Sequence, residues 1–145
     1  MRTRLLSLLL LCAPALLSAT LHAQTVKITV QLRDGNTGQP LPHQRLLLLL
    51  SQDASAPPEQ VSLTTQEDGD RQIELHVSAT AGLQVSPVGM DACAPLLSSY
   101  RLSEILQTGI TAPNTCNPTP LWTVTRPGSL TLYLRKPSST EKKLW

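Results

Sequence analysis

The sequence is poor in aromatic residues. It has no phenylalanine, two tyrosines and two tryptophans. Binding faces for sugars are built from exposed aromatic rings, which offer an apolar surface with a polar edge. The one candidate for a ligand contact of this kind is Trp122, in a proline-rich segment, and packing over the core is the competing interpretation. A carbohydrate-binding module is therefore not the first choice of function.

The chain also lacks a strong excess of charge of either sign. Its formal charge is +2, and Arg2 and Arg4 near the N-terminus account for this excess. Proteins that bind nucleic acids or anionic membranes by electrostatic attraction carry a basic patch or stripe. No such patch is visible here, so we expect no nucleic-acid partner.

Only one long apolar run occurs, and it stands at the N-terminus. Arg2 and Arg4 precede the run, which extends from residue 5 to residue 17, and Ala23 offers a small residue at a cleavage point before Gln24. This arrangement is typical of a secretory signal peptide and is too short for a comfortable membrane span. We expect residues 1–23 to be removed and the mature chain, without a membrane span, to be periplasmic or extracellular.

A lipoprotein signal ending at Cys12 is the alternative interpretation of the same segment. A lipobox requires a small residue directly before the cysteine, whereas Leu11 occupies that position. A cysteine at position 12 also leaves hardly any apolar segment upstream. A cleaved signal peptide is therefore favoured.

Cysteine is scarce, with three residues in the whole chain. Cys12 lies in the expected signal peptide, which leaves Cys93 and Cys116. An even pair in an exported chain predicts one disulfide. A metal site needs more nearby ligands than two thiols, and a redox pair is typically spaced as C-x-x-C, so we expect no cofactor.

Alternation of apolar and polar residues indicates strands. It occurs over residues 26–33, 72–77 and 130–135, and period-two alternation is typical of strands with one buried face. The run Leu46–Leu50 does not alternate and predicts a central strand covered on both faces, because it is short and flanked by prolines. Residues 61–65 and 83–85 complete the expected strands. We predict an all-β fold, a Greek-key β-sandwich of about seven strands.

The remaining segments predict connections. Residues 100–108 form one expected helical turn, ended by Gly109 in the left-handed conformation. Residues 111–128 contain four prolines and predict an irregular connection. Residues 24–136 are then one domain, and residues 137–145 are a flexible tail.

The first two turns carry a resemblance to a known family. The stretches RDGNTGQPLPHQRLLLL and LTTQEDGDRQIEL resemble the carboxypeptidase regulatory-like domains, a group of prealbumin-like (transthyretin-like) β-sandwiches. The likeness covers about residues 25–86 and implies an Ig-like sandwich of exported bacterial proteins. An aromatic residue usual after the second motif is missing, and Ile73 takes the later core position. The matching positions are Asp34, Thr37, Gly38, Pro40 and Leu41 in the first motif and Thr65 and Gly69 in the second.

These motifs are turn chemistry rather than catalytic chemistry. We expect Gly35 and Gly38 to supply positive φ, Asn36 to tolerate it, and Pro40 to start the next strand. Gly69 belongs to the acidic turn Glu67–Asp70, which lacks the ligand spacing of a calcium loop. The predicted role of Asp34, Gly35, Gly38, Pro40 and Gly69 is structural.

No residue set forms a recognisable catalyst. An enzyme would have to use His43 and His76, and each stands in the sequence without an evident oriented partner. Transthyretin-like hydrolases of 5-hydroxyisourate use histidines, an arginine and a C-terminal Y-R-G-S, whereas this chain reads Tyr133-Leu134-Arg135-Lys136. We therefore expect a non-catalytic exported module with a structural or protein-interaction role at the bacterial envelope. The alternatives are a small hydrolase of that type and a carbohydrate-binding module.

Export should yield a chain that begins at Gln24, with or without cyclisation of that residue, because signal peptidase removes residues 1–23. Intact-mass spectrometry of protein recovered from the periplasm or the medium measures this directly. A chain that begins at Met1, or one that carries a diacylated Cys12, would contradict the prediction.

Overall fold

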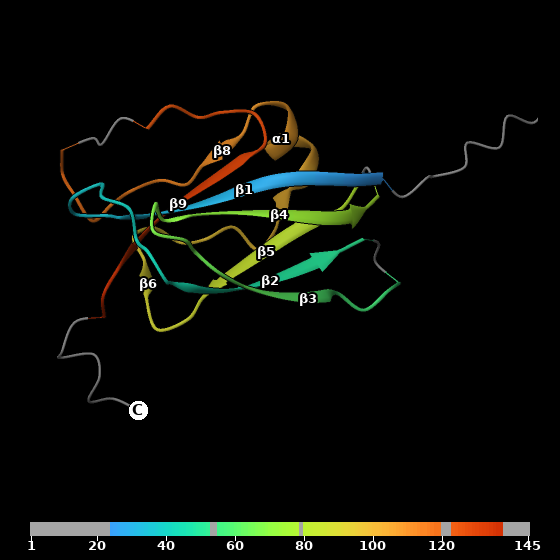
Figure 1. Ribbon diagram of the computed structural model, residues 1–145, viewed down its shortest axis with the longest axis horizontal. Coiled ribbons are helices and arrows are strands. Elements are labelled where there is room, and N and C mark those ends of the chain that lie inside the picture. Colours follow the sequence, from blue (N-terminus) through green and yellow to red (C-terminus); the bar gives the residue numbers. More distant parts are fainter. Residues whose placement is uncertain (1–23, 53–54, 79, 120–122, 138–145) are drawn as a thin grey trace, which may run out of the picture.

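The computed structural model describes residues 24–137 except 53–54, 79 and 120–122. The expected signal peptide, Trp122 and the tail from residue 138 onward lie outside the described residues. The described chain is mostly strand and forms two sheets that enclose one core, with a single short helix (Figure 1). The predicted all-β sandwich is confirmed.

One sheet has the strand order β4-β1-β9-β6, and β8 also pairs with β9. β1 lies between β4, to which it is antiparallel, and β9, to which it is parallel. The first and last long strands of the described chain therefore lie side by side, with Thr29 opposite Ser129 and Asp34 opposite Leu134. The strands of this sheet are β1 (Gln24–Asp34), β4 (Asp70–Val77), β6 (Asp91–Ala92), β8 (Ile110–Thr111) and β9 (Ser129–Arg135).

The second sheet has the order β3-β2-β5-β7 and is antiparallel throughout. β2 is central, as the leucine run predicts. Leu46, Leu48 and Leu50 are buried in the core, and the alternate side chains Leu47 and Leu49 are half-buried on the outer face, so the second face of this strand is only partly covered. The strands of this sheet are β2 (Arg45–Ser51), β3 (Glu59–Thr64), β5 (Gly82–Pro87) and β7 (Tyr100–Arg101).

The inward-facing residues of both sheets make the core. On β1 these are Ile28, Val30 and Leu32, all at most 1% exposed. On β9 the even-numbered leucines 130, 132 and 134 are fully buried, and the opposite face of this strand is also buried from Ser129 to Tyr133. β9 is thus the most enclosed strand. On its outer face, Tyr133 bonds through its hydroxyl to Thr123, and the Ser129 hydroxyl donates to the Arg126 carbonyl.

The helix α1 (Leu102–Gln107) is shorter than the predicted helical turn, since Tyr100 and Arg101 belong to β7. Leu102 and Ile105 anchor α1 in the core. Gly109 ends it with φ of 76°, as predicted. β6, β7 and β8 are strands that the sequence did not predict, because two residues cannot display a period. Within the described ranges, no helix is both long and apolar enough to cross a membrane.

The phenol of Tyr100 links the fold to pH. Tyr100 is 2% exposed, and burial raises its pKa above the usual value near 10, although a hydrogen bond from the Leu97 amide opposes this shift. The folded state therefore holds this proton more tightly than the unfolded chain does. Its contribution is complete below pH 10 and is lost as the pH rises through the folded-state pKa.

Alkaline solutions should accordingly destabilise the wild type more than a Tyr100→Phe variant, because phenylalanine keeps the ring but has no ionisable hydroxyl. Urea unfolding at a series of pH values from neutral to strongly alkaline measures the difference. Parallel loss of stability in both proteins above pH 10 would contradict the argument.

Candidate functional site

The two turns that carry the family resemblance lie against each other at one end of the sandwich. Thr65 is buried, and its hydroxyl donates to the Leu41 carbonyl at 2.7 Å and accepts the Gln44 amide at 3.0 Å. Gly69, with φ of 72°, packs so closely that a Cβ there would stand 2.7 Å from the Leu32 oxygen and 2.7 Å from the Leu41 nitrogen. Only glycine fits this backbone conformation and this contact. Both motifs therefore support one joint between the sheets.

The first turn, residues 34–38, is closed by Asp34. Its Oδ1 accepts the amides of Asn36 at 2.8 Å and Thr37 at 3.0 Å, as in an Asx-turn. Gly38 has the predicted positive φ of 75°, and its amide donates to the Asp34 carbonyl.

Three details of this turn differ from the sequence prediction. Gly35 and Asn36 do not have positive φ, and among the described non-glycine residues it is His43 that does, with φ of 56°. Pro40 does not start β2, which begins at Arg45, but forms an isolated bridge with Arg33. A turn at Pro42 and His43 lies between Pro40 and the start of β2.

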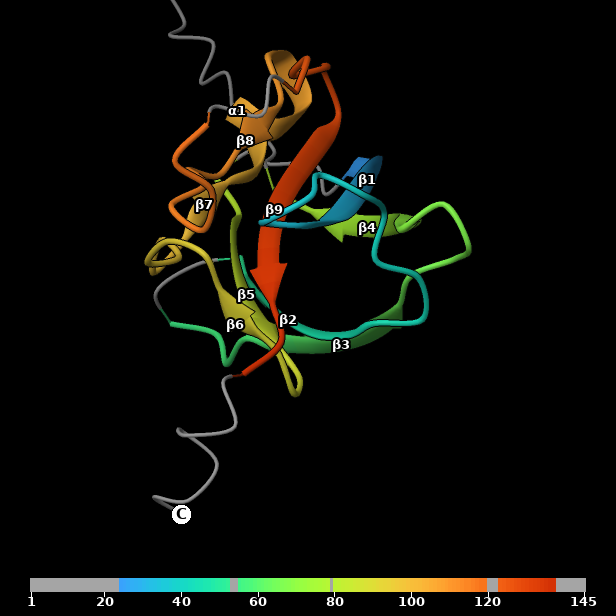
Figure 2. The same cartoon turned by 90° about the vertical axis from the view of Figure 1, so that its left-hand side faces the viewer.

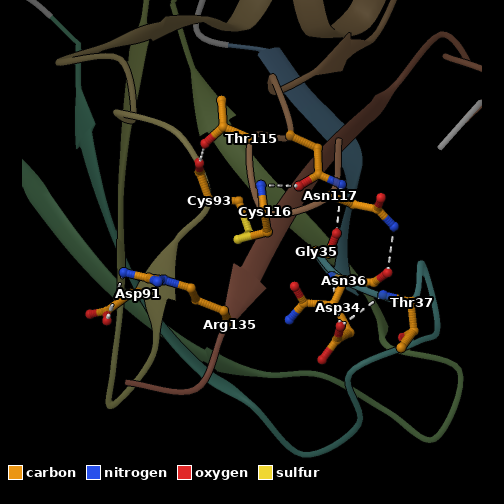
Figure 3. The surroundings of a disulfide bond; sticks show 11 residues. Asp34, Gly35, Asn36, Thr37, Asp91, Cys93, Thr115, Cys116, Asn117 and Arg135 are labelled. Carbon is orange, nitrogen blue, oxygen red and sulfur yellow. Dashed lines mark hydrogen bonds and ion pairs between the residues drawn. A yellow bond between two sulfur atoms is a disulfide. The ribbon is translucent and has the colours of Figure 1, made fainter. Parts of the chain in front are cut away.

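Gly35 is required for space. Its amide donates to the Leu134 carbonyl, which continues the pairing of β1 with β9. A Cβ at this position would overlap the Sγ of Cys93 and would stand 2.8 Å from the Cβ of Cys116. The turn thus lies against the sulfur atoms (Figure 3).

Cys93 and Cys116 are bonded, with an Sγ–Sγ distance of 2.05 Å and a Cα–Cα distance of 5.1 Å. This geometry fits the predicted disulfide. The segment after β8 also bonds to the first turn. The Asn114 side chain donates to the Gly35 carbonyl at 2.8 Å, and the Asn117 side chain donates to the Asn36 carbonyl at 2.6 Å. Figure 3 shows the contact of Asn117 with Asn36 near the sulfur atoms. The disulfide therefore braces the turn from outside.

The acidic turn after β3 is occupied by internal contacts. The Oδ1 of Asp70 accepts a hydrogen bond from Nη2 of Arg33 at 2.7 Å, and its Oδ2 accepts one from Nε2 of Gln31 at 2.9 Å. Asp68 accepts the Asp70 amide at 3.0 Å. In the described part of the chain, no group of three or more His, Cys, Asp or Glu side chains could hold a metal ion. These carboxylates thus serve the turn and the outer face of β1.

The two histidines are separate. His43 contacts Glu67 at 2.9 Å between Nε2 and Oε1, and both side chains are largely exposed. His76 bonds to the Thr25 hydroxyl at 2.8 Å. Glu67 precedes β4 and His76 is near its end, so at about 3.3 Å per residue the strand separates them by roughly 20 Å. Arg135, at the opposite side of the sheet, lies 4.0 Å from Asp91.

The aromatic residues that the structure describes are Tyr100 and Tyr133, and both are buried. Neither offers a ring to a ligand at the surface. Trp122, the predicted ligand contact, lies outside the described residues.

The sheets end in four edges of very different character. Among the described residues, β6, β7 and β8 are two residues long, whereas β3 and β4 are long and stand at the same side of the sandwich (Figure 2). β4 carries charges at Asp70, Arg71 and Glu74, but the sequence Gln60–Gln66 that contains most of β3 carries none. Short strands and charged side chains protect a sheet edge against pairing with another chain. β3 is six residues long, and its one charged residue is Glu59 at its start, so it has little of either protection.

A groove of about 520 Å³ runs between β3 and β4. Val61, Leu63 and Ile73 give it an apolar floor, and Arg71 and Glu74 stand at its β4 side. Sequence reasoning did not find this face. The uncharged stretch was readable, but its place at a sheet edge follows from strand order alone.

Comparison with models of protein families, with curated protein sequences and with solved structures finds no match to this chain. The resemblance to carboxypeptidase regulatory-like domains therefore stays a prediction from the residues of the two turns.

The brace can be tested with a double-mutant cycle. Replacing both Cys93 and Cys116 with alanine should lower the free energy of unfolding by about 2–4 kcal/mol and leave the sandwich folded. Gly35→Ala should cost about 1–3 kcal/mol in the wild type by overpacking, and less in the cysteine-free chain, because the Sγ that a Cβ would overlap is gone.

Denaturant unfolding of the four proteins measures the coupling. Gly89→Ala is the matched control: its added Cβ meets nothing within 4 Å, so its effect should not depend on the cysteines. Equal penalties for Gly35→Ala in both backgrounds would contradict the proposed contact.

Proposed function

We propose that this chain is an exported, non-catalytic β-sandwich module that binds proteins at the bacterial envelope through the edge of β3. The observation that carries the proposal is the edge strand β3, whose residues after Glu59 carry no charge. It offers backbone donors and acceptors over six residues, beside a groove with an apolar floor. Strand addition uses these features: the backbone ladder supplies affinity, and side chains that enter a neighbouring groove supply specificity.

The rest of the chain suits such a role. The disulfide and the Thr65 joint hold the turns at one end of the sandwich, so the strand edges keep their places. The small net charge favours contacts made by backbone and apolar groups over long-range attraction. A disulfide of this kind is typical of proteins in oxidising compartments.

The resemblance to carboxypeptidase regulatory-like domains supports the same role, since its matching residues build turns and joints here rather than a pocket. A transthyretin-like hydrolase is the second candidate. It would need its histidines to converge, whereas His43 and His76 have separate partners at opposite ends of β4.

Cross-linking and pull-down from the native envelope tests the proposal. A Ser62→Lys variant should lose the captured partner, because a lysine in the middle of β3 puts a charge on the edge. Ser62 is exposed, so the fold should tolerate it. Gln84→Lys is the matched control, because this substitution adds the same charge at an exposed position. Gln84 lies on β5, which is an inner strand of the same sheet.

Equal capture by both variants would contradict the use of β3. Turnover of 5-hydroxyisourate by the purified chain, lost on His76→Ala, would instead establish the hydrolase and overturn the non-catalytic assignment.

A further inference from the structure

The edge of β3 is complementary to itself. In an antiparallel pair of two β3 strands centred on Ser62, Val61 stands opposite Leu63 of the second copy, and Gln60 stands opposite Thr64. Apolar side chains then meet on the inner face and polar side chains meet on the outer face, which is the pairing that stabilises sheets. The twofold axis repeats each contact, as an isologous interface requires.

The neighbouring pairings are less favourable. A pair centred on Leu63 sets Glu59 opposite Glu67 of the second copy, and like charges directly opposite are destabilising. A pair centred on Val61 sets Thr64 opposite Pro58, which has no amide to donate to the ladder. The pair centred on Ser62 avoids both faults.

Two charges select the same pairing. Glu59 pairs with the buried Leu50, so its side chain points to the inner face of its sheet. Arg71 pairs with the buried Val30 and points inward from the other sheet. Both side chains are exposed, and neither makes an ion pair among the described residues.

The pairing centred on Ser62 brings these charges together. It sets Glu59 of the second copy opposite Thr65, at the end of the groove that Arg71 and Thr64 line. Sheets in a sandwich are about 10 Å apart, and two long side chains that point toward each other span this gap. The symmetry gives two such contacts, each between a glutamate of one copy and an arginine of the other.

We infer that the partner of β3 is a second copy of this chain, in a symmetric dimer whose sheet β3-β2-β5-β7 continues across the twofold axis. The inference rests on the proposed function, because it names the occupant of the same edge. Arg71 and Glu59 close the groove at both ends of the paired strands, and the apolar side chains of Val61 and Leu63 fill its centre.

The oligomeric state of the purified full-length product tests the inference. Sedimentation equilibrium or light scattering over a dilution series should give twice the mass of the chain, and Ser62→Lys should give the single mass, because it sets two lysines opposite each other at the axis. Gln84→Lys should remain dimeric. A single mass for the wild type at all concentrations would overturn the inference.

A charge exchange tests the register. Glu59→Arg or Arg71→Glu alone should raise the dissociation constant of the dimer about tenfold, because both symmetric contacts become repulsive. The combined variant should recover the wild-type value within about threefold. The proposed pairing would be overturned, even for a dimeric chain, if the effects of the two single substitutions on the dissociation constant simply combined in the double variant.

Failure here is distinguishable from failure of the proposed function. A monomeric wild type whose capture of envelope proteins is lost in Ser62→Lys overturns the dimer and keeps the interaction module, with a foreign strand on β3. A monomeric wild type whose capture does not depend on β3 overturns both.

Discussion

The parallel pairing of β1 with β9 joins the beginning and the end of the described chain. The ladder joins residues about one hundred positions apart and extends past the strands, since the Thr29 amide donates to the Gly128 carbonyl at one end and the Gly35 amide donates to the Leu134 carbonyl at the other. The Cys93 amide donates to the Tyr133 carbonyl, so the first cysteine is also held on β9. The disulfide therefore reinforces a position that the ladder has already set. Because such distant contacts must form before the core closes, we expect folding to be slow relative to helical domains of this size.

Local chemistry explains which parts of this fold the sequence predicts. Alternation placed β1, β4 and β9 correctly because apolar residues face the core at every second position, although β9 is buried on both faces. Gly38, Gly69 and Gly109 have the positive φ that their turns demand. Gly35 shows the limit of the same reasoning. It looks like a turn glycine, but its role is to leave space for the sulfur of Cys93, a residue far away in the chain. A position whose constraint comes from tertiary contact carries no local signal.

The sequence could not predict the candidate interaction face on β3, because the position of a strand within its sheet also depends on tertiary structure. The stretch Gln60–Gln66 shows its lack of charge in the sequence, but a central strand would show the same lack. Only the strand order places β3 at an edge and β2 in the centre. The absence of converging histidines is equally a tertiary result, because β4 separates the environments of His43 and His76.

The edge strands of the two sheets differ in length and charge. β4 carries several charged side chains, and the other end of each sheet is finished by two-residue strands. An edge that lacks such protection exposes a protein to aggregation unless a partner covers it. The rigid turns beside β3 would serve a protein that keeps this edge for a defined contact, because they fix the strand on which the contact depends. A strand that is firmly held and carries a single charged residue suits a binding edge. A partner that pairs with it removes the risk of aggregation at that edge.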